Sequence, residues 1–348
     1  MKSLLADDLN YILQQTHSLW NELKESALFI TGGTGFIGSW LLETFAWAND
    51  HLDLNLSVTI LTRDIEAYQR KAPHLVNHAL FRFIQGDVRD FVFPQEKFSH
   101  LIHAATEASQ SLNDEHPQLM FETIQQGTQH ILEFCTVAHI KKLLFLSSGA
   151  VYGKQPSHLS HLYETYENSE IALHALSAYG RGKRAAEALC LSHAKQYATE
   201  IKIARCFAFV GPYLPLDKHF AIGNFIRDGL VQLPIHIKSD GRAYRSYQYA
   251  ADLIISLLHL LCRGESCKAY NVGSELAISI LELAKLVADC FEPRLPIYLA
   301  NTAIDHTPPE RYVPCVQQLQ QELGLTMQIS LREAIKKTIH WHKQKIDL

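Results

Sequence analysis

The chain has 348 residues, of which 47% are hydrophobic and 20% charged, values that are ordinary for a globular protein with a sizeable core. The formal net charge of −4 provides no basic surface for a phosphate backbone, so nucleic acid is not expected as a partner. The seven cysteines lack CxxC spacing, and no helical zinc-binding pattern groups the nineteen histidines. We therefore expect reduced thiols, a cytoplasmic location and no metal site.

Residues 1–26 are predicted to form an amphipathic helix that docks on the body of the protein. Asp7 and Asp8 stand where a signal peptide would be apolar. The longest apolar run, LIISLLHLLC at 253–262, is too short to span a bilayer, so no membrane segment is expected. Apolar residues near helical spacing define the buried face of this helix: Leu5, Leu9, Ile12, Leu13, Leu19 and Leu23.

The stretch ALFITGGTGFIGSW predicts a buried strand over 27–31, a glycine turn and a helix. Gly32 permits a tight turn, Gly35 lets the backbone approach a pyrophosphate, and Gly38 lets the helix pack closely on the strand. Phosphates would lie at the amino terminus of the helix, where free N–H groups and the helix dipole favour negative charge. The turn therefore predicts a dinucleotide site, which the intervening Phe36 and Ile37 also line.

The tip of the second strand bears on the choice between NAD and NADP. An acidic residue at this tip would bind the ribose hydroxyls, whereas an arginine accommodates a 2′-phosphate. The tip reads Thr62, Arg63, Asp64, so that a threonine stands in the position of the usual acid. Arg63 therefore favours NADP slightly, while Asp64 keeps NAD possible and a solvated Arg–Asp turn is the alternative.

Further strands are predicted in LFRFIQGDVRD, HLIHAATEAS and KKLLFLSS. Asp87, followed by Val88, is placed to meet the adenine, and the small Ala104 and Ala105 let the backbone approach the cofactor. Because strands and helices alternate at this spacing, we predict an α/β fold with a doubly wound, parallel Rossmann sheet.

Three residues form a candidate catalytic set. Tyr179 and Lys183 are four residues apart in a predicted helix and therefore project from one face, and Ser148 ends the strand KKLLFLSS. A nearby ammonium and an oxidised nicotinamide would lower the pKa of a phenol, which normally lies near 10. Tyr179 could then exchange a proton with a sugar hydroxyl while hydride moves to or from the cofactor. Lys183 can also bind the nicotinamide ribose.

The motifs TGGTGFIG, SSGAVYG and YGRGK together resemble the extended short-chain dehydrogenase/reductase family, the NAD(P)-dependent nucleotide-sugar epimerases and dehydratases. The resemblance covers about residues 27–340 and implies that Ser148, Tyr179 and Lys183 are the catalytic triad. It also implies a homodimer joined through the helices predicted near 117–139 and 178–197.

The same resemblance suggests how the carboxyl-terminal half would bind a nucleotide-diphosphate sugar. Arg245 matches a family position that contacts the diphosphate, which suits a guanidinium fork. Arg311 matches the position of a second diphosphate or ribose contact. Asn224 and Phe225 lie in a segment resembling the loop and helix that hold the nucleotide-sugar. Thr106 and Glu107 complete the predicted substrate contacts. The strand in AYNVGSE is expected near the base of this site.

Departures from the family pattern narrow the chemistry. The 4,6-dehydratases place an Asp–Glu pair directly after the catalytic hydroxyl residue, and the decarboxylating members keep a Glu there. This chain has Gly149 and Ala150 instead, so the elimination of water lacks its acid and base. Fucose-type epimerising reductases use a Cys–His pair, but the 104–116 loop has no cysteine. Ile124 replaces a usual Asn, which puts the proton relay through that helix in doubt, and Glu107 is a possible substitute acid.

These observations predict a nucleotide-sugar 4-epimerase or 4-keto-sugar reductase that uses NAD or NADP. A dehydratase with a non-standard acid and base, and a catalytically idle protein that senses dinucleotides, are the alternatives. The predicted organisation is an amino-terminal helix over 1–26, a Rossmann domain over 27–205 with a returning segment near 240–260, and a smaller α/β substrate domain over 206–348.

Overall fold

The computed structural model describes residues 4–106, 110–166, 176–218, 220–300 and 308–346. The chain divides into two compact units. The first comprises residues 1–153, 168–206 and 254–270, and the second comprises 154–167, 207–253 and 271–348. The segment of the second half that returns to the first unit is thus 254–270.

The first unit is built on a seven-stranded sheet in the order β11-β6-β5-β4-β1-β2-β3. The pairs β1–β2, β1–β4, β2–β3, β4–β5 and β5–β6 are all parallel, which confirms the predicted Rossmann-like sheet. The strand order reverses between β1 and β4, the place where such sheets bind ligands. The strands are β1 (Ala27–Thr31), β2 (Ser57–Thr62), β3 (Phe81–Gln85), β4 (His100–His103), β5 (Lys142–Ser148), β6 (Glu200–Cys206) and β11 (Lys268–Val272).

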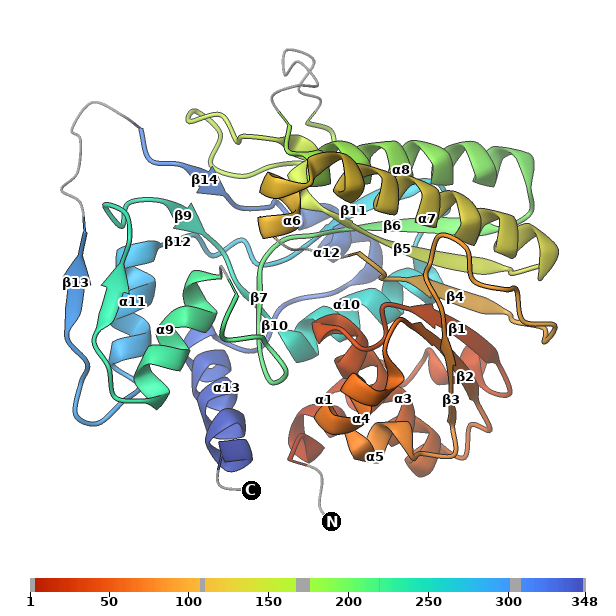
Figure 1. The fold of residues 1–348 in the computed structure, drawn as a ribbon, viewed down its shortest axis with the longest axis horizontal. Helices are drawn as coiled ribbons and strands as arrows, with labels where there is room; N and C mark the ends of the chain where they lie inside the picture. Colours follow the sequence, from red (N-terminus) through yellow and green to blue (C-terminus); the bar gives the residue numbers. More distant parts are fainter. Residues whose placement is uncertain (1–3, 107–109, 167–175, 219, 301–307, 347–348) are drawn as a thin grey trace. The chain divides into compact units, whose positions relative to one another are not determined.

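Helices cover both faces of this sheet. In Figure 1, α7 and α8 run side by side on one face of the sheet, and α3 lies on the other. This follows because the connections are right-handed and run from β1 toward β2 and β3 on one side and toward β5 and β6 on the other. The first-unit helices are α1 (Ala6–Gln15), α2 (Trp20–Leu23), α3 (Phe36–Leu52), α4 (Ile65–Lys71), α5 (Pro73–Val76), α6 (Gln110–Glu115), α7 (Pro117–Val137), the 3₁₀ turn η1 (Gly149–Tyr152) and α8 (Ala178–Gln196), and α10 (Ala250–Arg263) extends across both units.

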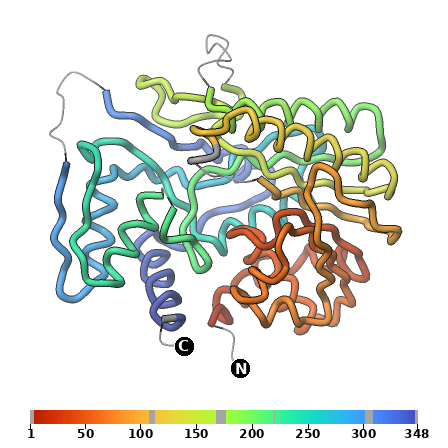
Figure 2. Tube along the Cα trace, in the orientation of Figure 1, coloured from red at the N-terminus to blue at the C-terminus, as the bar shows by residue number. Residues whose placement is uncertain are grey.

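The amino-terminal stretch forms two helices where one was expected. The hydroxyl of Thr16 donates a hydrogen bond to the Ile12 carbonyl oxygen and accepts one from the indole of Trp20, and α1 ends there. The expected apolar face is buried: Leu9, Ile12, Leu19 and Leu23 are at most 1% exposed. Figure 2 shows this red segment lying against the chain of α3, so it docks as predicted.

Aromatic packing fills the core between β1 and α7. Phe29 of β1 is fully buried, and its ring centroid lies 4.8 Å from that of Phe134 on α7 and 5.5 Å from that of Phe91. These contacts pack α7 against β1. In the described part of the chain, no helix is long and apolar enough to cross a membrane.

The described residues of the second unit form three small sheets. The largest has the strand order β12-β9-β14, and two-stranded sheets join β10 to β7 and β13 to β8. The strands of the second unit are β7 (Phe209–Val210), β8 (Ile235–Ile237), β9 (Tyr244–Arg245), β10 (Gln248–Tyr249), β12 (Ile278–Ser279), β13 (Ile297–Leu299) and β14 (Arg311–Tyr312). Besides part of α10, the helices of this unit are α9 (Ala221–Leu230), α11 (Ile280–Ala288), α12 (Gln317–Leu323) and α13 (Leu331–Ile346). The strand predicted in AYNVGSE is present as β11, the edge strand of the seven-stranded sheet.

Candidate active site

The glycine turn after β1 has the geometry that a dinucleotide requires. Gly32 adopts φ +71°, and a Cβ there would lie 2.6 Å from the Ala104 carbonyl carbon. A Cβ on Gly38 would lie 2.4 Å from the Gly32 oxygen, so α3 packs against the turn itself. Gly35 is the N-cap residue of α3 and no side chain caps this helix. The half-exposed Phe36 and Ile37 begin α3, and its first N–H groups suit a pyrophosphate.

The tip of β2 is more basic in the structure than its sequence alone suggests. Arg63 is exposed, whereas the carboxylate of Asp64 accepts a hydrogen bond from the Ala67 N–H and caps α4. Lys71 approaches the glycine turn, because its Nζ donates to the Thr34 carbonyl oxygen at 3.3 Å. Asp64 is therefore engaged by its own helix, and two cations lie at this end of the turn.

The predicted adenine contacts after β3 have neighbours of their own. The carboxylate of Asp87 forms a two-pronged pair with the Arg89 guanidinium, at 2.8 and 3.0 Å, and this pairing lowers the pKa of Asp87. Val88 faces α7, because a Cβ on Gly127 would lie 2.7 Å from Val88 Cγ1. The segment is thus fixed between the sheet and α7.

The end of β4 is held by a buried chain of polar groups. His103 lies between two threonines, with Nδ1 2.7 Å from the Thr31 hydroxyl and Nε2 3.3 Å from the Thr128 hydroxyl. Burial lowers the pKa of His103 to about 3, so the ring is neutral. The Ala105 N–H also donates to the Thr31 hydroxyl, which fixes the backbone next to Gly32.

Ser148, Tyr179 and Lys183 come together in the first unit. Tyr179 on α8 lies near Ser148 at the end of β5, close enough for the Ser148 hydroxyl to lower the pKa of the phenol. The Nζ of Lys183 donates to the Thr106 hydroxyl and to the Leu146 carbonyl oxygen, both at 2.7 Å. Thr106, predicted as a substrate contact, is therefore a partner of Lys183.

Burial governs the protonation of this set. It raises the pKa of Tyr179 to about 12, against a smaller lowering by the Ser148 hydrogen bond. It lowers the pKa of Lys183 to about 8. The sequence suggested that Lys183 would lower the pKa of Tyr179, but in the protein alone desolvation of the phenol outweighs any such effect. Tyr179 is therefore protonated near neutral pH in the protein alone. Formation of the phenolate requires a further positive charge nearby.

The structure shows the surroundings of the residues at which this chain departs from the family pattern. Ile124 is 3% exposed and packs on α8, where a Cβ on Gly182 would lie 2.9 Å from Ile124 Cδ1. It supplies no polar group to the site. Gly149 and Ala150 lie in the η1 turn, and the Ala150 N–H donates to the Ser148 hydroxyl. No ionisable side chain follows Ser148 before Tyr152.

In the second unit, the structure brings Arg245 and Arg311 onto neighbouring strands. In the parallel pair β9–β14, Tyr244 faces Arg311 and Arg245 faces Tyr312. The Arg311 guanidinium lies 4.2 Å from the centroid of the Tyr244 ring. Arg245 donates to the Tyr244 carbonyl oxygen at 2.8 Å, and its guanidinium is 3.7 Å from the Glu310 carboxylate. Tyr244, which the sequence did not single out, orders both cations.

The other predicted substrate residues differ in their surroundings. Phe225 is 4% exposed and belongs to the core of the second unit, so its ring has little surface for a ligand. The side-chain oxygen of Asn224 is buried and has no hydrogen-bond partner in the described ranges. Glu107 lies outside the described residues.

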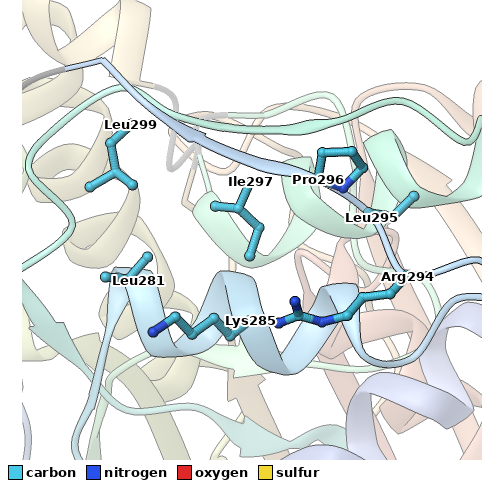
Figure 3. A pocket seen from close by; sticks show the side chains of 7 residues that line it. All are labelled: Leu281, Lys285, Arg294, Leu295, Pro296, Ile297 and Leu299. Carbon is cyan, nitrogen blue, oxygen red and sulfur yellow. The ribbon is translucent and has the colours of Figure 1, made fainter.

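A shallow groove of about 410 Å³ lies between α11 and β13 in the second unit (Figure 3). Its lining contains none of the predicted site residues and consists of Leu281, Lys285, Arg294, Leu295, Pro296, Ile297 and Leu299. In the described portion of the chain, no group of three His, Cys, Asp or Glu side chains is arranged to hold a metal ion.

Sequence reasoning missed a second set of residues behind the catalytic set. Glu187 and Arg205 form a buried ion pair, which also contacts Ser147 and Tyr152. One available signal was the position of Glu187, four residues after Lys183 and hence on the same face of α8. The partner on β6 could not be inferred without the register of the sheet.

The fold and the glycine turn are those of a Rossmann-type dinucleotide-binding protein. The model of the NAD-dependent epimerase/dehydratase family matches residues 28–273, and the chain belongs to this family. Among curated relatives, UDP-glucuronic acid decarboxylase 1 of Arabidopsis thaliana is 27% identical over 324 residues, which cover 93% of this chain and 71% of that protein. UDP-glucuronic acid decarboxylase 6 of the same plant is 26% identical, with 88% and 86% covered.

Solved structures confirm the fold. An epimerase of Methanothermobacter thermautotrophicus superposes with a TM-score of 0.80 at 22% identity, covering 96% of this chain and 97% of that one. A UDP-glucose 4-epimerase of Thermotoga maritima, solved with UDP-glucose, gives 0.77 at 20% identity, with 92% and 99% covered.

Proposed function

We propose that the protein is a nucleotide-sugar 4-epimerase or 4-keto-sugar reductase that transfers hydride at a sugar carbinol. The observation that best supports this proposal is that Tyr179 lies near Ser148, with the buried ammonium of Lys183 5.9 Å from the centroid of the Tyr179 ring. The two residues that follow Ser148 cannot ionise. The set therefore offers one acid/base group and one oxygen clamp, which is sufficient for redox chemistry at a carbinol.

A bound nicotinamide dinucleotide would accept or supply the hydride. Tyr179 gives a proton to the carbinol oxygen during reduction and removes one during oxidation. Ser148 donates a hydrogen bond to the same oxygen and holds it in place. Lys183 binds the nicotinamide ribose and keeps positive charge near the phenol.

Decarboxylation is the second candidate, because several curated relatives are named UDP-glucuronic acid decarboxylases. The decarboxylating members of the family keep a Glu after the catalytic hydroxyl residue, whereas this chain has Gly149 and Ala150 there. Because Gly149 and Ala150 supply no acid or base, the sequence also argues against dehydration. We expect a product that carries a hydroxyl at C4 and has lost neither carbon dioxide nor water.

The substrate we propose is a nucleotide-diphosphate sugar. Solved relatives bind UDP-glucose or a UDP-N-acetyl sugar according to their descriptions. In this chain, Arg245 and Arg311 lie on the adjacent strands β9 and β14, and each offers a guanidinium suited to a phosphate group. For the cofactor, the exposed Arg63 and the engagement of Asp64 in capping favour NADP over NAD.

The purified protein should be incubated with UDP-, dTDP-, GDP- and CDP-glucose, UDP-N-acetylglucosamine, UDP-glucuronic acid and a dTDP-4-keto sugar with NADPH. NMR of the products then reports the configuration at C4, and carbon dioxide release reports decarboxylation. We expect inversion or reduction at C4. Release of carbon dioxide from UDP-glucuronic acid would replace the proposal by the second candidate. Retained NAD(H), seen by absorbance near 340 nm and mass analysis, favours the epimerase, and exchange of NADPH favours the reductase.

We also propose a homodimer joined through α7 and α8. The two helices pack on each other within the chain, and Leu189 and Leu191 of α8 remain only partly buried. Light scattering after size-exclusion chromatography should give twice the mass of one chain, and Leu191→Glu should shift it toward one chain. An unchanged single-chain mass for the wild type would contradict this proposal.

A further inference from the structure

A buried ion pair connects α8 to β6 behind the candidate catalytic set. Arg205 Nη2 lies 2.8 Å from Glu187 Oε2, and Arg205 Nε lies 3.1 Å from Glu187 Oε1. The side chains of Glu187 and Arg205 are only 8% and 17% exposed. The guanidinium therefore meets the carboxylate in a two-pronged arrangement, away from most solvent screening.

The same carboxylate also holds β5. The hydroxyl of Ser147 donates a hydrogen bond to Glu187 Oε1 at 2.5 Å. Ser147 faces Arg205 in the parallel register of β5 and β6, and the next pair in this register is Ser148 with Cys206. One side chain of α8 thus binds the two strands immediately before the position of Ser148.

Arg205 extends the network to the far side of Ser148. Its Nη1 donates to the Tyr152 hydroxyl at 2.9 Å, and its guanidinium carbon lies 4.9 Å from the centroid of the Tyr152 ring. Tyr152 is 3% exposed and ends the η1 turn that begins after Ser148. Ser148 is therefore bracketed by Ser147 before it and Tyr152 after it, and both partners are tied to the same ion pair.

The spacing on α8 aligns this network with the proposed catalytic residues. Tyr179, Lys183 and Glu187 follow each other at intervals of four residues and share one helix face. Lys183 binds the Leu146 carbonyl and Glu187 binds the Ser147 hydroxyl, so successive residues of β5 are held by successive turns of α8. We infer that Glu187 and Arg205 are positioning residues for the proposed reaction, fixing Ser148 relative to Tyr179 and Lys183; this inference rests on the proposed function.

Stability alone does not account for a charged pair at this place. Burying two charges costs free energy that their attraction offsets only with good geometry, and packed apolar residues often serve equally well. The charge of Glu187 has a second effect, since it raises the pKa of Lys183 against the larger lowering by burial. Among the described residues, the titratable groups near Lys183 besides Glu187 are Tyr179 and Cys190 on α8, Cys206 on β6, and His103 on β4.

The test is Glu187→Gln, which keeps the shape and the acceptor for Ser147 but removes the charge. Turnover of the probe from the nucleotide-sugar panel should fall about 10²-fold in kcat with little change in KM, because a small displacement of the catalytic groups suffices for such a loss. Independently of turnover, NADH affinity followed by fluorescence from pH 6 to 10 should begin to weaken at a lower pH than in the wild type. The Lys183→Met variant shows which part of the pH dependence of NADH affinity is due to Lys183.

Glu200→Gln is the matched control. It breaks the pair of Glu200 with the fully buried Lys202 near the opposite end of β6, so it should lower Tm without altering kcat or the NADH profile. If Glu187→Gln does not fold, Tyr152→Phe tests the positioning role, because it removes only one hydroxyl of the network. It should lower kcat several-fold at near wild-type Tm, and an unchanged kcat would contradict the positioning role.

The outcomes separate the two claims. If the panel gives no turnover, or if Tyr179→Phe is as active as the wild type, the proposed function fails. If Tyr179→Phe is inactive while Glu187→Gln keeps the wild-type kcat and NADH profile, only the positioning role is overturned. A loss of kcat in Glu187→Gln matched by an equal loss in Glu200→Gln would likewise overturn it, since general destabilisation would explain both.

Discussion

The Nζ atom of Lys183 donates a hydrogen bond to the Leu146 carbonyl oxygen at 2.7 Å and so joins α8 to β5 two residues before Ser148. A second bond of the same length reaches the Thr106 hydroxyl. An ammonium has three donors, two of which are used in the described part of the chain, and we propose that the third meets a ribose hydroxyl. The protein alone therefore already holds Lys183 in the place that the proposed reaction needs.

Replacing Tyr179 by Phe removes only the phenolic hydroxyl. We expect turnover on the panel substrate to fall by about 10²–10⁴-fold, the usual contribution of a positioned acid or base. The NADH dissociation constant should stay near the wild-type value, because Lys183 keeps its bonds to β5 and Thr106. Steady-state kinetics and fluorescence titration measure the two quantities. Retained turnover would remove Tyr179 from the mechanism.

The pH dependence of stability should show two opposite slopes. Lys183 has a folded pKa of about 8 against an ordinary 10.5, so the unfolded chain binds more protons between these values and the free energy of unfolding gains a rising contribution there. Tyr179 has a folded pKa of about 12 against an ordinary 10.0, so its contribution falls from pH 10 to 12. Urea unfolding at each pH should show that Lys183→Met loses the rise and Tyr179→Phe loses the fall.

Two glycines of the turn should separate cofactor binding from folding. A methyl group at Gly35 would lie 3.4 Å from the Gly32 oxygen, so Gly35→Ala should change stability by no more than about 1 kcal/mol while weakening dinucleotide binding at least tenfold. A methyl group at Gly38 would lie 2.4 Å from backbone, so Gly38→Ala should cost about 1–3 kcal/mol. Thermal unfolding and NAD(P)H titration distinguish the two. Unchanged binding in Gly35→Ala would place the pyrophosphate elsewhere.

Arg63 provides a test of cofactor preference. Because it is exposed beside the turn that Lys71 also approaches, Arg63→Ala should weaken NADPH binding about tenfold or more and leave NADH binding nearly unchanged. Fluorescence titrations with both reduced cofactors measure the ratio. Equal losses for NADPH and NADH would show that Arg63 does not recognise a 2′-phosphate.

Local signals were sufficient for the first five strands and for the glycine turn. Buried apolar runs followed by Gly32 or Ser148 mark strand ends, and the i, i+4 spacing places Tyr179 and Lys183 on one face of α8. Interactions between distant segments were not predictable in this way. The bond from Lys183 to Thr106, and the pairing of Glu187 with Arg205, depend on strand order and register. The pKa of Tyr179 depends on burial, which spacing does not report.

The capping role of Asp64 constrains any redesign of cofactor preference. An engineer who wished to favour NAD would look first to the one acidic residue at the tip of β2, but its carboxylate already accepts the Ala67 N–H at 2.8 Å. Turning Asp64 toward a ribose would leave the start of α4 uncapped, at a cost of about 1 kcal/mol. The new carboxylate would have to be introduced at Thr62, whose hydroxyl now accepts the Asp64 N–H at 3.4 Å and lies 3.3 Å from the Thr34 hydroxyl.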